Sequence, residues 1–287
     1  MKIRKAIIPA AGIGTRFLPA TKSLPKEMLS VIDKPLILYS VEEAVQSGIE
    51  SIAIITSRGK SSMEDYFDKS PELERFLEEK GKLDFLKEVR RISELAEFYY
   101  IRQKEALGLG HAVLTGEKFI GQEPFAVLLP DDIYEGTTPC TKQLIEAYDE
   151  YQASAIVLGR TDEEGTKMYG IVKPRQVTER VFQIEDLVEK PGPEKAFSDL
   201  ASLGRYIFTP EIFEGLKKTK PDQRGEIQLP DGIKHLLEKQ KVYGVLFEGD
   251  RYDCGDKMGF LEATFSLALK RPEFSDRLKT YLRSLKS

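Results

Sequence analysis

Cysteine and histidine are scarce in this sequence of 287 residues, which has two of each: Cys140 and Cys254, and His111 and His235. Two cysteines that lie far apart in the chain do not support a disulfide framework or a thiolate metal site, and we expect small, buried side chains at both positions. Two isolated histidines likewise argue against a histidine metal cluster. Catalysis by this chain is therefore not expected to depend on imidazole.

Long apolar runs and tracts of one charge are also missing. No stretch approaches the roughly 20 apolar residues of a membrane span, and residues 1–5 do not lead into a signal-peptide core. The net charge is −4 with 31% charged residues, so no nucleic acid is expected as a partner and any anion site must be local. These absences predict a cytoplasmic protein with no membrane partner. With 41% hydrophobic residues the chain can build a sizeable core, and we expect a single domain over residues 1–287.

Apolar strands alternate with amphipathic helices through the first half of the chain. The expected strands are Ile3–Pro9, Ser51–Thr56, Phe98–Arg102 and Phe125–Leu129, and the expected helices are Pro35–Ser47, Ser61–Phe67 and Gly110–Phe119. This alternation predicts an α/β fold with a Rossmann-like, mostly parallel sheet that helices cover on both faces.

The pattern changes after Leu129, where several strands follow one another with few helices between them. The expected strands are Ala153–Leu158, Ile171–Lys173, Val181–Val188, Leu203–Phe208 and Val242–Phe247. A mixed sheet is therefore expected in this half. Helices are expected at Pro210–Lys217 and Gln228–Gln240, together with a helical excursion near residues 70–97 and terminal helices near residues 257–285.

A glycine-rich loop follows the first strand, in the run IIPAAGIGTRFLP at residues 7–19. Gly12 and Gly14 let the backbone turn sharply and bring N–H groups close to an anion, and Arg16 adds a planar cation suited to phosphate oxygens. The dinucleotide fingerprint G-x-G-x-x-G is an alternative, but Phe17 stands where its third glycine should be. A tight turn without a ligand is the other alternative. The loop favours phosphate binding.

Acidic side chains follow two later strands. Pro130-Asp131-Asp132 comes after the strand ending at Leu129, and residues 251–256 (RYDCGD) again put carboxylates at a turn. Carboxyl ends of strands in an open α/β sheet face the ligand crevice, and Mg²⁺ takes one or two carboxylates plus substrate phosphates. Asp131 and Asp253 are therefore predicted to hold Mg²⁺, with an exposed Asp-Asp turn as the alternative.

The strand ending at Val188 is followed by Glu189-Lys190-Pro191. A lysine is a compact point charge suited to a phosphate, and a neighbouring glutamate can accept hydrogen bonds from sugar hydroxyls. Taken alone, this tripeptide favours an ordinary surface strand end.

Together these motifs resemble the bacterial UTP–glucose-1-phosphate uridylyltransferase family of sugar nucleotidyltransferases, from Lys5 to about Phe265. The resemblance rests on the loop AAGIGTRFLPATK with PKEML and DKPLI, and on RQ, GLGHA, LPDD, YG, VEKP, GRY, GEIQL and DCG further along the chain. The glycine loop and the Lys-Pro motif are common to sugar nucleotidyltransferases, whereas PKEML and GLGHA point to this branch.

The resemblance implies a nucleotide-diphospho-sugar transferase fold and formation of UDP-glucose and pyrophosphate from UTP and glucose 1-phosphate. It assigns the nucleotide to Ala11, Gly12, Gly14, Glu27, Gln103 and Gly108, with Gln103 pairing its amide with the uracil edge as both donor and acceptor. Arg16 and Lys26 would hold the triphosphate and Lys190 the sugar phosphate, while Gly170, Glu189 and Gly204 would line the sugar pocket. Mg²⁺ on Asp131 and Asp253 and a homodimer or homotetramer are expected. A thymidylyltransferase, a transferase of another nucleotide, or a non-catalytic relative remain the alternatives.

Overall fold

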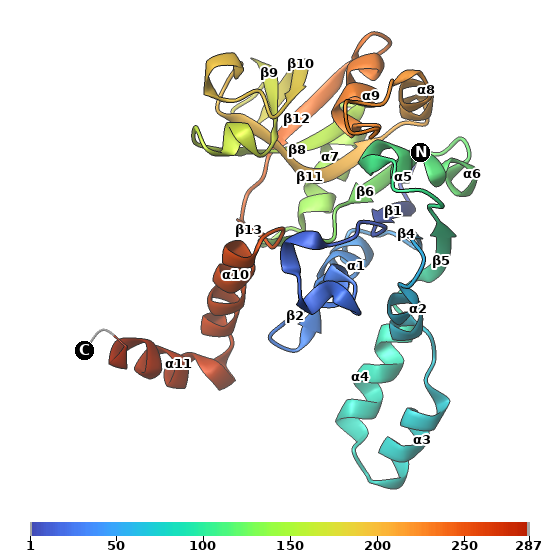
Figure 1. Ribbon diagram of the computed structural model, residues 1–287, viewed down its shortest axis with the longest axis vertical. Helices are drawn as coiled ribbons and strands as arrows, with labels where there is room; N and C mark the ends of the chain where they lie inside the picture. The colour runs from blue at the N-terminus through green and yellow to red at the C-terminus, as the bar shows by residue number, and fades with distance from the viewer. Residues whose placement is uncertain (1, 286–287) are drawn as a thin grey trace.

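The computed structural model describes residues 2–285, and within these residues nine strands form one sheet (Figure 1). In spatial order the strands are β5 (Glu97–Arg102), β4 (Ser51–Thr56), β1 (Lys5–Pro9), β6 (Phe125–Leu128), β11 (Leu200–Phe208), β8 (Ser154–Arg160), β12 (Val242–Leu246), β10 (Val181–Glu189) and β9 (Gly170–Gln176). The four strands from β5 to β6 run parallel to one another. Beyond β6 the sheet is mixed, because β11 and β10 are antiparallel to their neighbours whereas β8 and β12 pair in parallel.

Helices cover both faces of this sheet, which follows from the side-chain alternation of a strand. In β1, Ala6 and Ile8 face one core and Ile7 faces the other. The first core is completed by α1 (Leu36–Gln46), α2 (Ser61–Phe67) and α7 (Cys140–Tyr151). The second is completed by α5 (Gly108–Thr115), α6 (Glu117–Ile120), α8 (Glu211–Lys218) and α9 (Leu229–Leu237).

Helix α7 was not predicted, since few helices were expected after Leu129. The sequence does carry a helical signal there: Leu144, Ile145 and Tyr148 fall on one face, and all three are buried. A second difference is that the expected helix Gly110–Phe119 is divided into α5 and α6 at Gly116. A side chain at Gly116 would collide with Ile7 of β1, so the helix passes close to the sheet at this point.

Two helical segments extend away from the sheet (Figure 1). The first is the hairpin of α3 (Pro71–Glu79) and α4 (Leu83–Ser93), at the excursion expected near residues 70–97. The second is formed by α10 (Lys257–Lys270) and α11 (Pro272–Ser284), at the expected terminal helices. Across residues 2–285, every helix is too short or too polar to cross a membrane.

Two small antiparallel sheets lie beside the large one. β2 (Ser30–Val31) pairs with β3 (Lys34–Pro35), and β7 (Asp132–Glu135) pairs with β13 (Asp250–Asp253). The second pairing corrects the turn expected at residues 251–256, because residues up to Asp253 belong to a strand. It sets Asp253 opposite Asp132 and so joins two acidic segments that lie far apart in the sequence.

Candidate active site

The glycine-rich loop leaves the carboxyl end of β1 and turns at Gly14, whose φ of 74° lies in the left-handed region. A Cβ at Gly14 would also lie only 3.2 Å from Cβ of Lys26, so glycine permits both the turn and the close approach. Thr21 Oγ1 donates a hydrogen bond to the carbonyl oxygen of Gly14 at 2.7 Å. The loop is therefore held from its own far end while Ile13 remains exposed.

Two clefts meet beside this loop. The first, of about 460 Å³, lies between the glycine loop, the end of β5, the start of α5 and the end of β6. The second, of about 200 Å³, lies between the ends of β9 and β10, the middle of β11 and β13. Leu109, Leu129 and Asp131 line both clefts, so the two spaces adjoin at the Asp131 carboxylate.

Every site residue predicted from the sequence lines at least one cleft. The first cleft contains Ala11, Gly12, Gly14, Lys26, Glu27, Gln103, Gly108 and Asp131. The second contains Arg16, Asp131, Gly170, Glu189, Lys190, Gly204 and Asp253. The structure thus places the expected nucleotide residues together and the expected sugar residues together. Arg16, which was expected to hold the triphosphate, lines the cleft of the sugar residues.

Lys26 and Asp131 form an ion pair where the clefts adjoin, with 2.6 Å between Nζ and Oδ2. Burial opposes the charge on each side chain, but the opposite charge beside it outweighs that effect. The pKa of Lys26 is therefore raised, with Glu27 adding to the effect of Asp131, and the pKa of Asp131 is lowered. Both groups are held in their charged forms at the centre of the site.

Glu27 and Lys60 form a second ion pair behind the glycine loop, at 2.8 Å and almost fully buried. Lys60 Nζ also donates to the carbonyl oxygen of Ala10 at 2.5 Å, so it fixes the start of the loop. Burial raises the pKa of the Glu27 carboxyl despite the neighbouring lysines. Sequence reasoning missed Lys60, because no motif marks it and its partners are distant in the chain.

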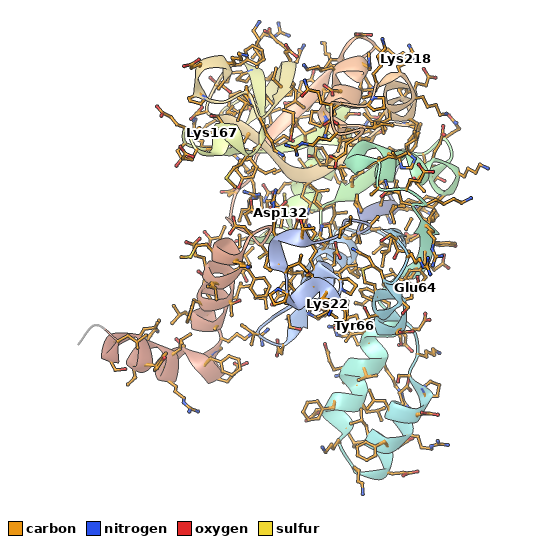
Figure 2. All side chains as sticks on the ribbon, in the orientation of Figure 1. Lys22, Glu64, Tyr66, Asp132, Lys167 and Lys218 are labelled. Atoms are coloured by element: carbon orange, nitrogen blue, oxygen red, sulfur yellow. The ribbon has the colours of Figure 1, made fainter. Side chains whose placement is uncertain are left out.

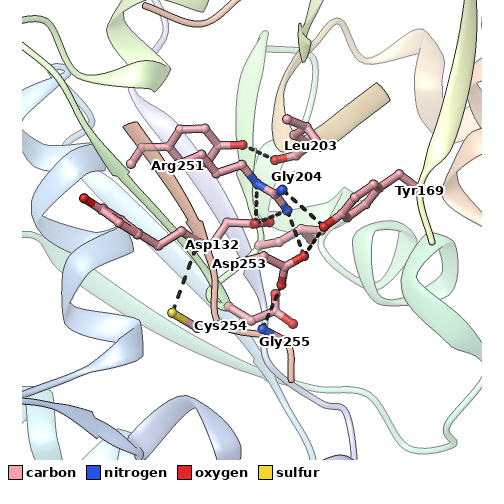
Figure 3. A network of polar contacts seen from close by, with 12 residues as sticks. Asp132, Tyr169, Leu203, Gly204, Arg251, Asp253, Cys254 and Gly255 are labelled. Atoms are coloured by element: carbon pink, nitrogen blue, oxygen red, sulfur yellow. Dashed lines mark hydrogen bonds and ion pairs between the residues drawn. The ribbon is translucent and has the colours of Figure 1, made fainter. Parts of the chain in front are cut away.

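Asp132 lines the second cleft, where Arg251 covers its carboxylate, whereas Asp131 lines both clefts (Figure 3). Arg251 Nε donates to Asp132 Oδ1 at 2.8 Å, and its Nη2 donates to Asp253 Oδ2 at 3.2 Å. Burial raises the pKa of Asp132 to about 7; Arg251 opposes this rise, and the carboxylates of Asp131 and Asp253 add to it. Figure 2 places Asp132 near the centre of the molecule, between its upper and lower parts.

Asp253 is held by three groups. Its Oδ1 accepts a hydrogen bond from the backbone N–H of Gly255 at 2.8 Å, and its Oδ2 accepts from Tyr169 Oη at 2.5 Å and from Arg251 (Figure 3). A Cβ placed on Gly255 would lie 2.9 Å from Asp253 Oδ1 and 3.6 Å from both Asp131 Oδ2 and Arg16 Nη1. The two carboxylates predicted as metal ligands and one cation therefore surround the same point.

The oxygen donors at this point suit a hard cation. Within the described part of the chain, no three acidic, histidine or cysteine side chains are grouped as a metal site. The candidate metal ligands at this point are therefore the two carboxylates of Asp131 and Asp253. A pair is sufficient for Mg²⁺ where substrate phosphates complete the coordination. The residues present thus fit the expected ion.

Lys190 lies at the end of β10 with a φ of 47°, a left-handed conformation that is unusual for lysine. Its Nζ is 3.3 Å from Glu189 Oε1, and both side chains are partly exposed to the second cleft. Burial raises the pKa of Glu189, against the effect of Lys190. Gly170 lies close to the same carboxylate, since a Cβ there would be 3.2 Å from Glu189 Oε2.

Arg205, on β11, supports the site from behind and is fully buried. Its guanidinium pairs with Glu43 on α1, with 2.9 Å between Nη2 and Oε2. It also donates to the carbonyl oxygens on either side of the Asp131 turn, those of Leu129 at 2.7 Å and Asp132 at 2.8 Å. The sequence showed Arg205 only as part of a resemblance motif, and nothing in it indicated this role.

These features agree with comparison to known proteins: a family model described as nucleotidyl transferase matches residues 5–269, and the chain belongs to this family. A protein of Bacillus subtilis (strain 168) named UTP–glucose-1-phosphate uridylyltransferase is 52% identical over 284 residues, which is 99% of this chain and 97% of that protein. A solved structure of UDP-glucose pyrophosphorylase complexed with UDP-glucose is 46% identical and superimposes with a TM-score of 0.87, covering 94% of this chain and all of the other. A solved structure of UDP-glucose pyrophosphorylase from Acinetobacter baumannii is 39% identical and has a TM-score of 0.91. The match covers 99% of this chain and all of the Acinetobacter chain.

Proposed function

We propose that this chain is a UTP–glucose-1-phosphate uridylyltransferase, which forms UDP-glucose and pyrophosphate from UTP and α-D-glucose 1-phosphate. Relatives about 50% identical over nearly the whole chain carry this name. The observation in the structure that supports it best is the pair of clefts that adjoin at Asp131. One cleft contains a phosphate-binding glycine loop and the other a lysine and a glutamate, as a nucleotide and a sugar phosphate would require.

The reaction joins two anions and needs no general base. A phosphate oxygen of glucose 1-phosphate attacks the α-phosphorus of UTP, and the bond from that phosphorus to the bridging oxygen breaks. Pyrophosphate leaves with the electron pair. A sugar phosphate is already largely dianionic at neutral pH, because its second pKa is about 6. Alignment and charge neutralisation are therefore the main work of the site.

Cationic side chains provide that neutralisation. Two unit charges 4 Å apart repel by roughly 4 kcal/mol at an effective dielectric constant of about 20, which a few cations can offset. Lys26 lies in the first cleft for the triphosphate and Lys190 in the second for the sugar phosphate, and Arg16 lies in the second cleft on the side of Asp131. Glu189, Gly170 and Gly204 complete the sugar pocket.

Asp131 and Asp253 would hold Mg²⁺ at the point that they share with Arg16. The ion would neutralise charge on the phosphate oxygens of the reacting groups. Tyr169 and Arg251 orient the Asp253 carboxylate, and Lys26 orients that of Asp131.

The test is pyrophosphate release by the purified protein, with UTP, dTTP, CTP and ATP each offered together with glucose, galactose and mannose 1-phosphate. We expect the highest kcat/KM for UTP with glucose 1-phosphate. Preference for dTTP would identify a thymidylyltransferase instead, and release from no pair would indicate a non-catalytic relative. The Lys190→Ala variant serves as the inactive control, because it should lose sugar-phosphate binding without losing the fold.

The chain is also proposed to form a homodimer or homotetramer. Apolar side chains are exposed along α10 and α11, among them Leu261, Phe265 and Tyr281, and the two helices line an apolar groove of about 500 Å³. An exposed apolar surface of this kind is typical of an interface. Sedimentation equilibrium tests the assembly, and a monomer at micromolar concentration would contradict it.

A further inference from the structure

The side-chain amide of Gln103 has a defined orientation beside the first cleft. Its Nε2 lies 3.1 Å from the carbonyl oxygen of Gly108 and 2.9 Å from Nδ1 of His111. A carbonyl oxygen only accepts hydrogen bonds, so the Gln103 atom facing it must be the NH₂ group rather than the amide oxygen. One hydrogen goes to Gly108 and the other to His111. His111 Nδ1 therefore accepts, and the ring carries its proton on Nε2.

Gln103 and its two acceptors lie in segments that backbone hydrogen bonds hold in place. Gln103 follows β5 and is 6% exposed, and its N–H donates to the carbonyl oxygen of Thr56 at 2.9 Å. Gly108 opens α5 with a φ of 90°, and His111 follows within the same first turn of that helix. Ile227 holds this turn on both sides, since its N–H donates to Leu107 and its carbonyl oxygen accepts from Gly110, each at 2.8 Å.

Among residues 2–285, this arrangement leaves Gln103 with one free hydrogen-bonding function, the acceptor Oε1. An amide that is free to rotate offers a donor or an acceptor to a base, whereas the amide held here offers only the acceptor. This differs from the sequence-based expectation that Gln103 donates to and accepts from uracil at once, because both Nε2 hydrogens are already used. The contact would accept the ring N3–H of uracil or thymine and would oppose the N3 lone pair of cytosine.

We infer that His111 is a positioning residue for base specificity: together with the Gly108 carbonyl it holds the Gln103 amide, so that this site selects a pyrimidine that carries an N3–H. The inference rests on the proposed function, in which Gln103 contacts the base. His111 thereby has a role that the sequence did not indicate: it orients the Gln103 amide and transfers no proton.

The test compares His111→Leu with His111→Asn, with kcat/KM measured for UTP, CTP and dTTP at saturating glucose 1-phosphate. Leucine fills the space without an acceptor, whereas the Asn oxygen can take the place of Nδ1. In His111→Leu the preference for UTP over CTP should fall by up to roughly tenfold, because the Gly108 carbonyl is then the single acceptor that holds the amide, and turning the NH₂ toward cytosine costs one hydrogen bond less. The preference for UTP over dTTP should not change, since both bases carry the N3–H. A general loss of structure would lower all three values together.

His111→Asn should keep the wild-type UTP:CTP ratio to within about threefold, and His235→Leu, at the other histidine, should leave all three substrates unaffected. An unchanged UTP:CTP ratio in His111→Leu would overturn the inference. Should His111→Leu fail to fold, judged by its circular dichroism spectrum, His111→Ala takes its place in the same comparison.

Gln103→Leu separates this inference from the proposed function. If it lowers the UTP:CTP ratio while His111→Leu does not, Gln103 reads the base but His111 does not position it. If neither variant changes the ratio, Gln103 does not read the base, and the inference fails with that contact. Failure of the wild-type protein to use UTP at all would instead refute the proposed function.

Discussion

Replacing Arg205 with methionine should destabilise the protein severely and disturb the site at the same time. Arg205 is 0% exposed and Glu43 is 7% exposed, so the substitution leaves a carboxylate buried without its cation. Burial alone would lower the pKa of the Arg205 guanidinium, but Glu43 raises it, so the guanidinium is charged in the folded protein. Removing one partner of such a pair costs about 3–5 kcal/mol.

The cost is large relative to a typical free energy of unfolding of about 5–15 kcal/mol. For a chain of this size each kcal/mol shifts Tm by roughly 2–3 °C, so Arg205→Met should lower Tm by about 6–15 °C. Differential scanning calorimetry at pH 7.5 measures the shift. The carbonyl oxygens of Leu129, Asp132 and Gly204 also lose their donor, so kcat should fall even below the new Tm.

Two further variants test the reasoning. Glu43→Gln combined with Arg205→Met removes the uncompensated charge, so the double variant should be at least as stable as Arg205→Met alone. Lys217→Met breaks the exposed Lys217–Glu117 pair, at 2.5 Å in the structure, and should leave Tm unchanged because exposed pairs contribute little. Equal shifts in Arg205→Met and Lys217→Met, or a double variant less stable than Arg205→Met, would refute the argument.

Three other predictions concern the clefts. Asp131→Asn should fold but lose about 2–3 kcal/mol of transition-state stabilisation, roughly a hundredfold in kcat, and near-normal kcat at millimolar Mg²⁺ would contradict its assignment as a ligand. Lys190→Ala should raise KM for glucose 1-phosphate and leave the affinity for UTP, measured by calorimetry, unchanged. Arg16→Ala should weaken UTP binding in the same assay. Equal effects of the two variants on UTP affinity would show that the two cations are wrongly assigned. Gly204→Ala should cost about 1–3 kcal/mol in urea unfolding, because Gly204 has a φ of 79° and a Cβ there would collide with Asp132 Oδ2; wild-type stability would contradict this.

The elements that place the glycine loop and the Asp131 turn could be read from the sequence because their signals are local. Ser51–Thr56 and Ser61–Phe67 begin and end at the residues that the pattern predicted. Side-chain periodicity and turn residues report on neighbours in the chain, and they suffice where burial follows that periodicity. Helix α7 was missed although its apolar spacing was present.

The sequence by itself determined which chemical groups the site contains: a glycine loop after a strand, two acidic segments and a lysine at a strand end. Only the tertiary structure decided how they pair. Lys26 meets Asp131 across 105 residues, and Arg205 meets Glu43 across 162. The register of β7 and β13 sets Asp132 beneath Arg251, whereas Asp131 lies where the two clefts adjoin. Such pairings depend on where the folded chain returns to itself, and neither composition nor periodicity records that.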